Sequence, residues 1–253
     1  MYIDSHAHVY LPEFADDLAL LLTEAADVGV QEVYMPNIDS STIKSLHETE
    51  DRFANCKAMM GLHPCYVKEN YKEEVQTVES WLTQRRYAAL GEVGIDFYWD
   101  KTFVEEQQWA FERQIALAKE HGLAIIIHSR DSLHLTIDTI SKYQDGSLRG
   151  IFHCFNGTVE QGQAIADLGF YMGIGGVVTF KNAGVDRVVE QLSLQNMVLE
   201  TDAPYLSPVP YRGKRNTVGY TPLIAEKLAS IHQVDVKEIA QITTDNCRSV
   251  FNY

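Results

Sequence analysis

The chain has 253 residues, of which 45% are hydrophobic and 22% charged, an ordinary composition for a globular protein with a large core. Its formal net charge of −14 argues against broad contact with a phosphate backbone, although it permits a local phosphate site that contains cations. The 4 cysteines form no C-x-x-C pair, which favours reduced thiols in the cytoplasm over a disulfide framework.

No targeting or membrane segment is expected. The first ten residues contain neither a basic region nor an apolar run, so they do not resemble a signal peptide. No stretch reaches the roughly 18 apolar residues of a membrane span. We therefore expect a soluble cytoplasmic protein with no membrane contact, and no feature of the sequence indicates an obligate protein partner.

Short apolar runs alternate with amphipathic segments along the chain. Each run has about the length of a buried parallel strand. The predicted strands are residues 2–6, 32–36, 57–61, 87–92, 123–128, 150–153, 170–175 and 196–201. The predicted helices are residues 13–28, 41–50, 73–86, 103–121, 131–143, 159–168, 185–192 and 221–232, followed by a last helix at 236–250. Gly122 is a plausible C-cap for the helix at 103–121.

Eight strand–helix units in regular alternation predict an α/β fold of the (β/α)8 TIM-barrel type, with the extra C-terminal helix packed outside. No linker or low-complexity segment divides the sequence, so we expect a single domain over residues 1–253. The alternative fold is an open doubly wound sheet, which needs a glycine-rich phosphate loop after its first strand. The first strand here ends in Ser5-His6-Ala7-His8, without glycine, and the barrel is therefore favoured.

Six side chains of metal-ligand type end the predicted strands or follow them directly. They are His6, His8, Glu92, His128, His153 and Asp202. A barrel brings such positions together at the carboxyl ends of its strands, where active sites of this fold lie. One histidine at a strand end is more often structural, but burying six such groups without a metal would cost several kcal/mol.

Four imidazoles and two carboxylates suit zinc, and also manganese, iron or nickel. Six ligands are too many for one catalytic ion with an open position. Two divalent ions about 3.5–4 Å apart that share a carboxylate fit the set better.

The remaining histidines divide into two groups. His63 follows the third predicted strand and faces the barrel mouth, where it either contacts substrate or caps a loop. His47, His121, His134 and His232 lie in predicted helices, and we expect them at the surface.

Basic residues mark a possible anion site. Arg130 follows His128 and is a candidate for binding an anionic group of the substrate. Arg212, Lys214 and Arg215 form the densest basic cluster of an acidic chain, in the loop after the eighth strand. This loop either captures phosphate or is a surface loop held by salt bridges to acidic neighbours.

Seven motifs, taken in order, make the sequence resemble the TatD family of metal-dependent hydrolases, within the amidohydrolase-like barrels. The ordered set is specific and covers nearly the whole chain. The motifs are Asp4-Ser5-His6-Ala7-His8, Gly61-Leu62-His63-Pro64, Gly91-Glu92-Val93-Gly94-Ile95-Asp96, Ile127-His128-Ser129-Arg130, His153-Cys154-Phe155-Asn156-Gly157, Glu200-Thr201-Asp202-Ala203-Pro204-Tyr205-Leu206 and Arg212-Gly213-Lys214-Arg215-Asn216.

The resemblance implies two divalent metal ions and hydrolysis of phosphodiester bonds, typically by a deoxyribonuclease with 3′→5′ exonuclease character. The metal is expected to be zinc, with magnesium, manganese, iron or nickel as alternatives. By position, one ion is held by His6, His8, Glu92 and Asp202. The other is held by His128 and His153, and Glu92 bridges the two. The family usually continues after Asn216 with an acidic residue and a proline, where this chain has Thr217-Val218.

The expected reaction assigns Glu92, Asp202 and His63 as catalytic residues. Asp202 takes the proton of the attacking water, and His63 protonates the leaving group. The expected substrate is a single-stranded DNA end or another phosphate ester, bound by Arg130 and by the three basic residues of the loop.

Two other functions compete with this one. Small-molecule amidohydrolases share the H-x-H strand and the aspartate after strand eight, but many bridge their metals with a carboxylated lysine on strand four. This chain has Glu92 there and no lysine between residues 87 and 96. A non-enzymatic metal-binding protein is disfavoured by an intact ligand set with two carboxylates and room for water.

Overall fold

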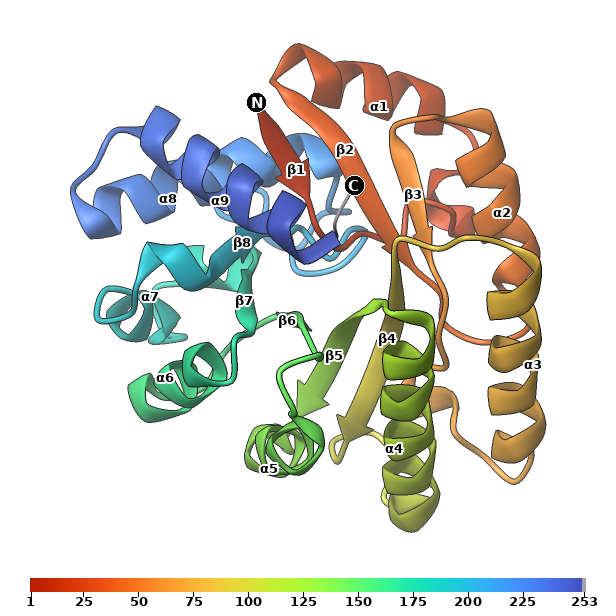
Figure 1. Ribbon diagram of the computed structural model, residues 1–253. Coiled ribbons are helices and arrows are strands. Elements are labelled where there is room, and N and C mark those ends of the chain that lie inside the picture. Colours follow the sequence, from red (N-terminus) through yellow and green to blue (C-terminus); the bar gives the residue numbers. More distant parts are fainter. Residues whose placement is uncertain (252–253) are drawn as a thin grey trace.

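The computed structural model describes residues 1–251 as eight parallel strands enclosed by helices (Figure 1). The strands are β1 (Tyr2–Asp4), β2 (Val30–Pro36), β3 (Cys56–Met59), β4 (Ala89–Asp96), β5 (Ala124–Arg130), β6 (Gly150–Phe152), β7 (Tyr171–Ile174) and β8 (Met197–Leu199). The helices are α1 (Leu18–Asp27), α2 (Ile43–Arg52), α3 (Tyr71–Gln84), α4 (Val104–His121), α5 (Leu133–Tyr143), α6 (Val159–Asp167), α7 (Val185–Val189), α8 (Thr221–His232) and α9 (Val236–Phe251). The predicted alternation and the extra C-terminal helix are confirmed.

Backbone hydrogen bonds close the sheet into a barrel. The strands form two ladders, β1-β2-β3 and β4-β5-β6-β7-β8, all parallel. Between β3 and β4, the Met60 N–H donates to Ala89 O (3.1 Å) and the Gly91 N–H donates to Met60 O (2.9 Å). Between β8 and β1, the Ser5 N–H donates to Leu199 O (2.9 Å). The TIM-barrel prediction is therefore confirmed over the open-sheet alternative.

The central strands are buried on both faces, which explains why they read as continuous apolar runs rather than as alternating patterns. Every residue of β4 is buried. Helix α4 ends at Gly122, whose φ of 64° and ψ of 25° are left-handed, as expected for a glycine C-cap. The last helix packs against the barrel through Phe251, whose ring stacks on that of Tyr34 at 3.8 Å between centroids.

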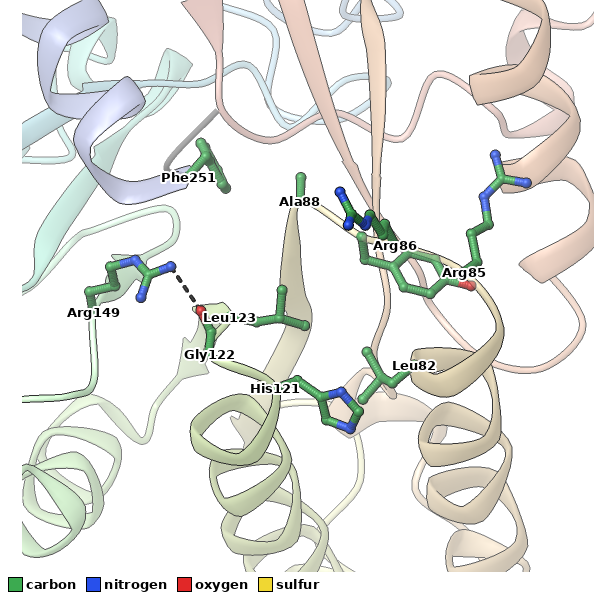
Figure 2. Close-up of a pocket in the computed structure, with 10 residues that line it drawn as sticks. Leu82, Arg85, Arg86, Ala88, His121, Gly122, Leu123, Arg149 and Phe251 are labelled. Carbon is green, nitrogen blue, oxygen red and sulfur yellow. Dashed lines mark hydrogen bonds between the residues drawn. The ribbon is translucent and has the colours of Figure 1, made fainter.

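A cavity of about 570 Å³ lies at the amino ends of β4, β5 and β6 (Figure 2). Three arginines line it, and two of them make contacts within the protein that stabilise the fold. Arg149 donates to Val250 O and Gly122 O (both 2.9 Å), and Arg85 donates to Glu50 Oε2 (2.5 Å). Arg149 thus ties α9 to the end of α4, and Arg85 ties the end of α3 to α2, on the face that serves stability in this fold.

Most strand boundaries differ by one to four residues from the sequence prediction, and the carboxyl ends of β1 and β4 are two that bear on the site. Strand β1 ends at Asp4, so His6 and His8 lie beyond it in extended chain that bonds alternately to both neighbours. Strand β4 continues to Asp96, so Glu92 lies inside a strand rather than at its end. Gly94 permits this, because its φ is 141° and a Cβ there would lie 2.0 Å from the carbonyl oxygen of His128 on β5.

The first helix also begins later than predicted. Residues 13–28 were expected to be helical, but Pro12–Phe14 forms a separate 3-10 turn and α1 starts at Leu18.

Candidate metal centre

Glu92 lies at the centre of the predicted ligand set, completely buried at the carboxyl end of the barrel. Its Oε2 atom is 3.1 Å from His6 Nε2 and 3.6 Å from His8 Nε2. Its Oε1 atom is 2.7 Å from His128 Nδ1 and 3.7 Å from His153 Nε2. The two carboxylate oxygens therefore face two different pairs of imidazoles.

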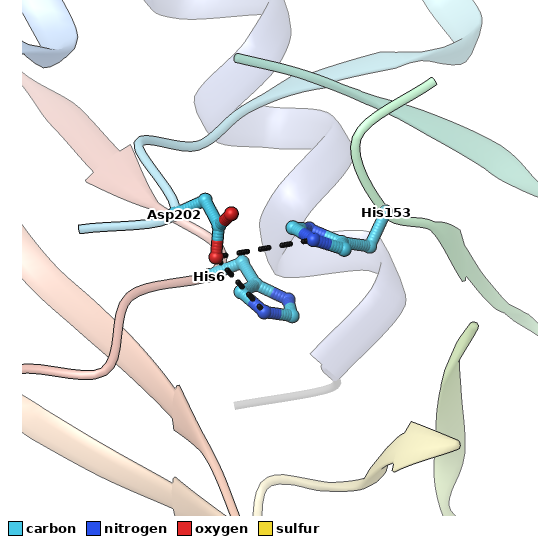
Figure 3. A group of neighbouring side chains, drawn as sticks. All are labelled: His6, His153 and Asp202. Atoms are coloured by element: carbon cyan, nitrogen blue, oxygen red, sulfur yellow. Dashed lines mark ion pairs between the residues drawn. The ribbon is translucent and has the colours of Figure 1, made fainter. Parts of the chain in front are cut away.

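Asp202 completes the group from the loop after β8. Its Oδ1 atom is 3.6 Å from His8 Nε2, 3.9 Å from His6 Nε2 and 4.0 Å from His153 Nε2. Figure 3 shows its carboxylate pointing toward the rings of His6 and His153, which stack on each other at 3.5 Å between centroids. The structure thus brings all six predicted residues together.

In three of the histidines, the ring nitrogen that faces away from Glu92 and Asp202 lies beside a polar partner. His8 Nδ1 is 3.2 Å from the Tyr10 hydroxyl, which donates to Pro36 O. His128 Nε2 is 2.9 Å from Asp96 Oδ2. His153 Nδ1 is at ion-pair distance from Glu200 Oε1 (3.0 Å), without hydrogen-bond geometry. One nitrogen of each ring is engaged in this way while the other faces Glu92 or Asp202, as in metal-ligating histidines.

His6 has no such partner. It is fully buried, and within residues 1–251 neither of its ring nitrogens makes a hydrogen bond of acceptable geometry. An unsatisfied buried polar group is costly, and a cation beside Glu92 would satisfy this one.

The charges of the group favour ligation. Burial raises the pKa of Glu92, but the imidazoles of His63, His6 and His153 outweigh burial and hold that pKa well below its usual value. Burial opposes protonation of His153, but the carboxylates of Glu200 and Glu92 raise its pKa to about 10. Glu92 is therefore ionised at neutral pH, and a cation that binds His153 displaces a proton.

His63 caps a loop, which is one of the two roles that the sequence suggested for it, and its ring also faces the centre. Its Nδ1 atom accepts a hydrogen bond from the Cys65 N–H (3.1 Å) and caps the short turn Pro64–Tyr66. In the neutral ring the proton is then on Nε2, which is 3.4 Å from Glu92 Oε1. His63 therefore presents an N–H donor, rather than a ligand lone pair, to the centre.

A cavity of about 560 Å³ opens over the group, and we call it the cleft. His8, His63, Glu92, His128, His153, Asp202 and Arg130 are among the residues that line it. The loop residues Arg212, Lys214 and Arg215 do not line it.

The basic loop makes its own contacts. The Arg215 guanidinium pairs with Asp17 (Nη2 to Oδ2, 2.6 Å) and donates to the backbone oxygen of Glu13. Arg212 lies 4.5 Å above the Phe180 ring, and its side chain is exposed, as is that of Lys214. For Arg215 the structure matches the salt-bridge alternative that the sequence allowed.

Sequence reasoning missed Asp96, Glu200 and Tyr10. Asp96 and Glu200 lie within motifs that the sequence analysis noted, four residues after Glu92 and two before Asp202. The surface position expected for His47 is wrong, because its ring is half-buried and its Nε2 atom lies 2.8 Å from the Tyr87 hydroxyl. His121 and His232 are also partly buried, whereas His134 is exposed.

Comparison with known proteins places this geometry in a family. The family model described as TatD related DNase matches residues 3–252. An uncharacterized metal-dependent hydrolase of Bacillus subtilis, YabD, is 34% identical over 252 residues, 99% of each chain. A 3′-5′ ssDNA/RNA exonuclease TatD of Yersinia pseudotuberculosis is 28% identical and is matched over 94% of this chain and 95% of its own length.

The crystal structure of YJJV, a TatD homolog from Escherichia coli, has a TM-score of 0.94 and 27% identity, with 100% of this chain and 98% of that chain covered. Within residues 1–251 no helix is both long and apolar enough to cross a membrane. The fold, the six converging side chains and the full-length match agree, and the chain belongs to the family of TatD-related DNases.

Proposed function

We propose that this chain is a phosphodiesterase that uses two divalent cations, zinc first among them, to remove nucleotides from single-stranded DNA ends in the 3′→5′ direction. The observation that carries the proposal is the position of Glu92, whose two oxygens face two separate groups of imidazoles. The activity named for the Yersinia relative supports the choice of substrate.

Two cations would share these residues. One cation would be held by His6, His8, Asp202 and Glu92 Oε2, and the other by His128, His153 and Glu92 Oε1. Bound ions of this kind activate water at neutral pH and offset the charge that develops on a phosphoryl group.

The side chains around the centre supply the remaining chemistry. Asp202 is 14% exposed and lines the cleft, so its carboxylate can take a proton from an attacking water. His63 directs its Nε2–H toward the same space and would offer a hydrogen bond to the leaving oxygen, whose proton would come from water in the open cleft. Arg130 lines the cleft and binds a phosphate of the substrate. Arg212 and Lys214 are exposed and would contact a longer strand.

The proposal is tested by metal analysis of protein purified without chelator, followed by hydrolysis assays. The substrates are linear single-stranded, linear duplex and circular single-stranded DNA, with an amide panel for comparison. We expect linear single strands to be hydrolysed fastest, because an end reaches a recessed cleft that the middle of a duplex does not. Equal cleavage of circular and linear DNA would contradict the end preference, and turnover of amides alone would replace the proposed reaction.

A further inference from the structure

Exposed aromatic side chains gather at the cleft. Trp99 is 69% exposed, Tyr205 49% and Tyr66 47%, and all three line this cavity. They come from three loops, which follow β4, β8 and β3 respectively. Tyr98, beside Trp99, is 55% exposed. Large apolar surface that is left in water at a binding cleft marks a recognition surface.

Asp96, beside the candidate metal centre, holds the backbone of Trp99. Asp96 Oδ1 accepts hydrogen bonds from the backbone N–H groups of Tyr98 (2.9 Å) and Trp99 (3.1 Å). The other oxygen of the same carboxylate contacts His128 Nε2 at 2.9 Å. One buried side chain therefore sets both the orientation of a candidate ligand and the backbone that carries the exposed indole.

Arg130 adds a cation to this aromatic surface. Its guanidinium carbon lies 3.9 Å from the centroid of the Tyr98 ring and 5.4 Å from that of Trp99. Arg85 and Arg215 are paired with carboxylates, whereas Arg130 has no ion pair within residues 1–251. The aromatic rings thus hold the guanidinium while leaving its charge available to an anion.

On the basis of the proposed function, we propose that Trp99 stacks on the nucleobase next to the scissile phosphate while Arg130 binds a phosphate of the same strand. An aromatic face beside an available guanidinium matches the two parts of a nucleotide, the flat base and the charged backbone. Stacking of this kind accepts any base, so the site would show little sequence preference. Because a base inside a duplex is already stacked on its neighbours, the site selects unpaired bases.

The test compares Trp99→Ala with Trp109→Ala, which removes another exposed tryptophan that does not line the cleft. Both are assayed, loaded with metal, on a single-stranded oligonucleotide and on the same strand with abasic residues at its 3′ end. We expect Trp99→Ala to raise KM about tenfold on the base-bearing strand and to leave KM on the abasic strand unchanged, since stacking contributes about 5- to 150-fold per base. Trp99→Phe should restore most of the affinity, and Trp109→Ala should behave as wild type.

A second readout does not depend on turnover. Binding of a phosphorothioate single strand should quench tryptophan fluorescence in the wild type and lose that quenching in Trp99→Phe. Equal KM increases on both strands, or quenching that survives in Trp99→Phe, would overturn the stacking role. Absence of hydrolysis with every metal, together with Trp99-dependent quenching, would instead refute the proposed function while the binding inference stands.

Discussion

Replacing Gly173 with alanine should weaken metal binding at the candidate centre, although Gly173 is not one of its ligands. A Cβ on Gly173 would lie 2.1 Å from Glu200 Oε2 and 2.5 Å from Glu200 Cδ, and both distances are much shorter than a van der Waals contact. Burial and two contacts hold the carboxylate of Glu200 in place. It is fully buried, and its Oε1 atom accepts from the Cys154 N–H (2.6 Å) and contacts His153 Nδ1. The added methyl group must therefore displace the carboxylate that orients His153.

Two effects of known size should follow. Overpacking of a buried position costs about 1–3 kcal/mol of stability. In a protein of about this size, each kcal/mol lowers Tm by roughly 2–4 °C. Loss of the partner behind a metal-ligating histidine weakens metal binding or activity about 10- to 100-fold.

The assay measures urea unfolding of the metal-free protein and metal affinity by competition with a chromophoric chelator. Gly175→Ala is the matched control, because a Cβ there meets its nearest neighbour at 3.6 Å, an ordinary contact. We expect its stability to change by no more than about 0.5 kcal/mol. If Gly173→Ala bound metal as tightly as Gly175→Ala, the carboxylate of Glu200 would not be what positions His153.

Three further predictions address separate parts of the molecule. Glu92→Gln keeps the shape of the side chain but removes its charge, and should lower kcat/KM at saturating metal by more than about 100-fold with an unchanged circular dichroism spectrum; retained activity would refute the bridging role. Arg130→Ala should raise KM about tenfold with little change in kcat. Arg215→Ala should leave both constants unaltered, because Arg215 is already paired with Asp17. A higher KM in Arg215→Ala than in Arg130→Ala would show that the basic loop, and not Arg130, binds the phosphate. Burial lowers the pKa of His47 below its ordinary 6.5, so the unfolded chain takes up a proton that the folded state does not, and stability should fall as pH drops through about 6.5. Urea midpoints between about pH 7 and pH 5 should show that loss in the wild type and a smaller one in His47→Gln.

The fold could be predicted because its strands are buried on both faces and its helices have one apolar face. Both features are local patterns in the sequence. The ends of the strands could not be predicted, because they depend on distant partners. The chain after Asp4 leaves a regular ladder since Ser5 bonds to Leu199 on one side and Ala7 bonds to Tyr34 on the other. The length of β4 likewise depends on how closely Gly94 approaches His128.

The members of the candidate site could be predicted from residue type and strand order, because a barrel gathers the carboxyl ends of its strands whatever its loops do. The residues that contact the ligand histidines could not be predicted in this way. Whether Asp96 or Glu200 contacts a histidine depends on ring rotation, which the sequence does not encode locally. Nor does charge density in the basic loop reveal that Arg215 pairs with Asp17, 198 positions earlier in the chain.

The charge distribution makes phosphate binding conditional on the cations. Glu92, Asp96 and Asp202 all line the cleft, and the chain as a whole carries a formal charge of −14. Burial raises the pKa values of all three carboxylates, but the surrounding histidines, and for Asp96 two backbone N–H groups as well, outweigh burial and hold these values below their usual range. Each carboxylate therefore carries its negative charge at neutral pH. The guanidinium of Arg130 and the protonated imidazole of His153 together do not offset these three carboxylates, and a phosphate would be repelled from the metal-free centre. The two divalent ions that we propose would reverse the sign of that local field, so metal loading should control substrate binding as well as the chemical step.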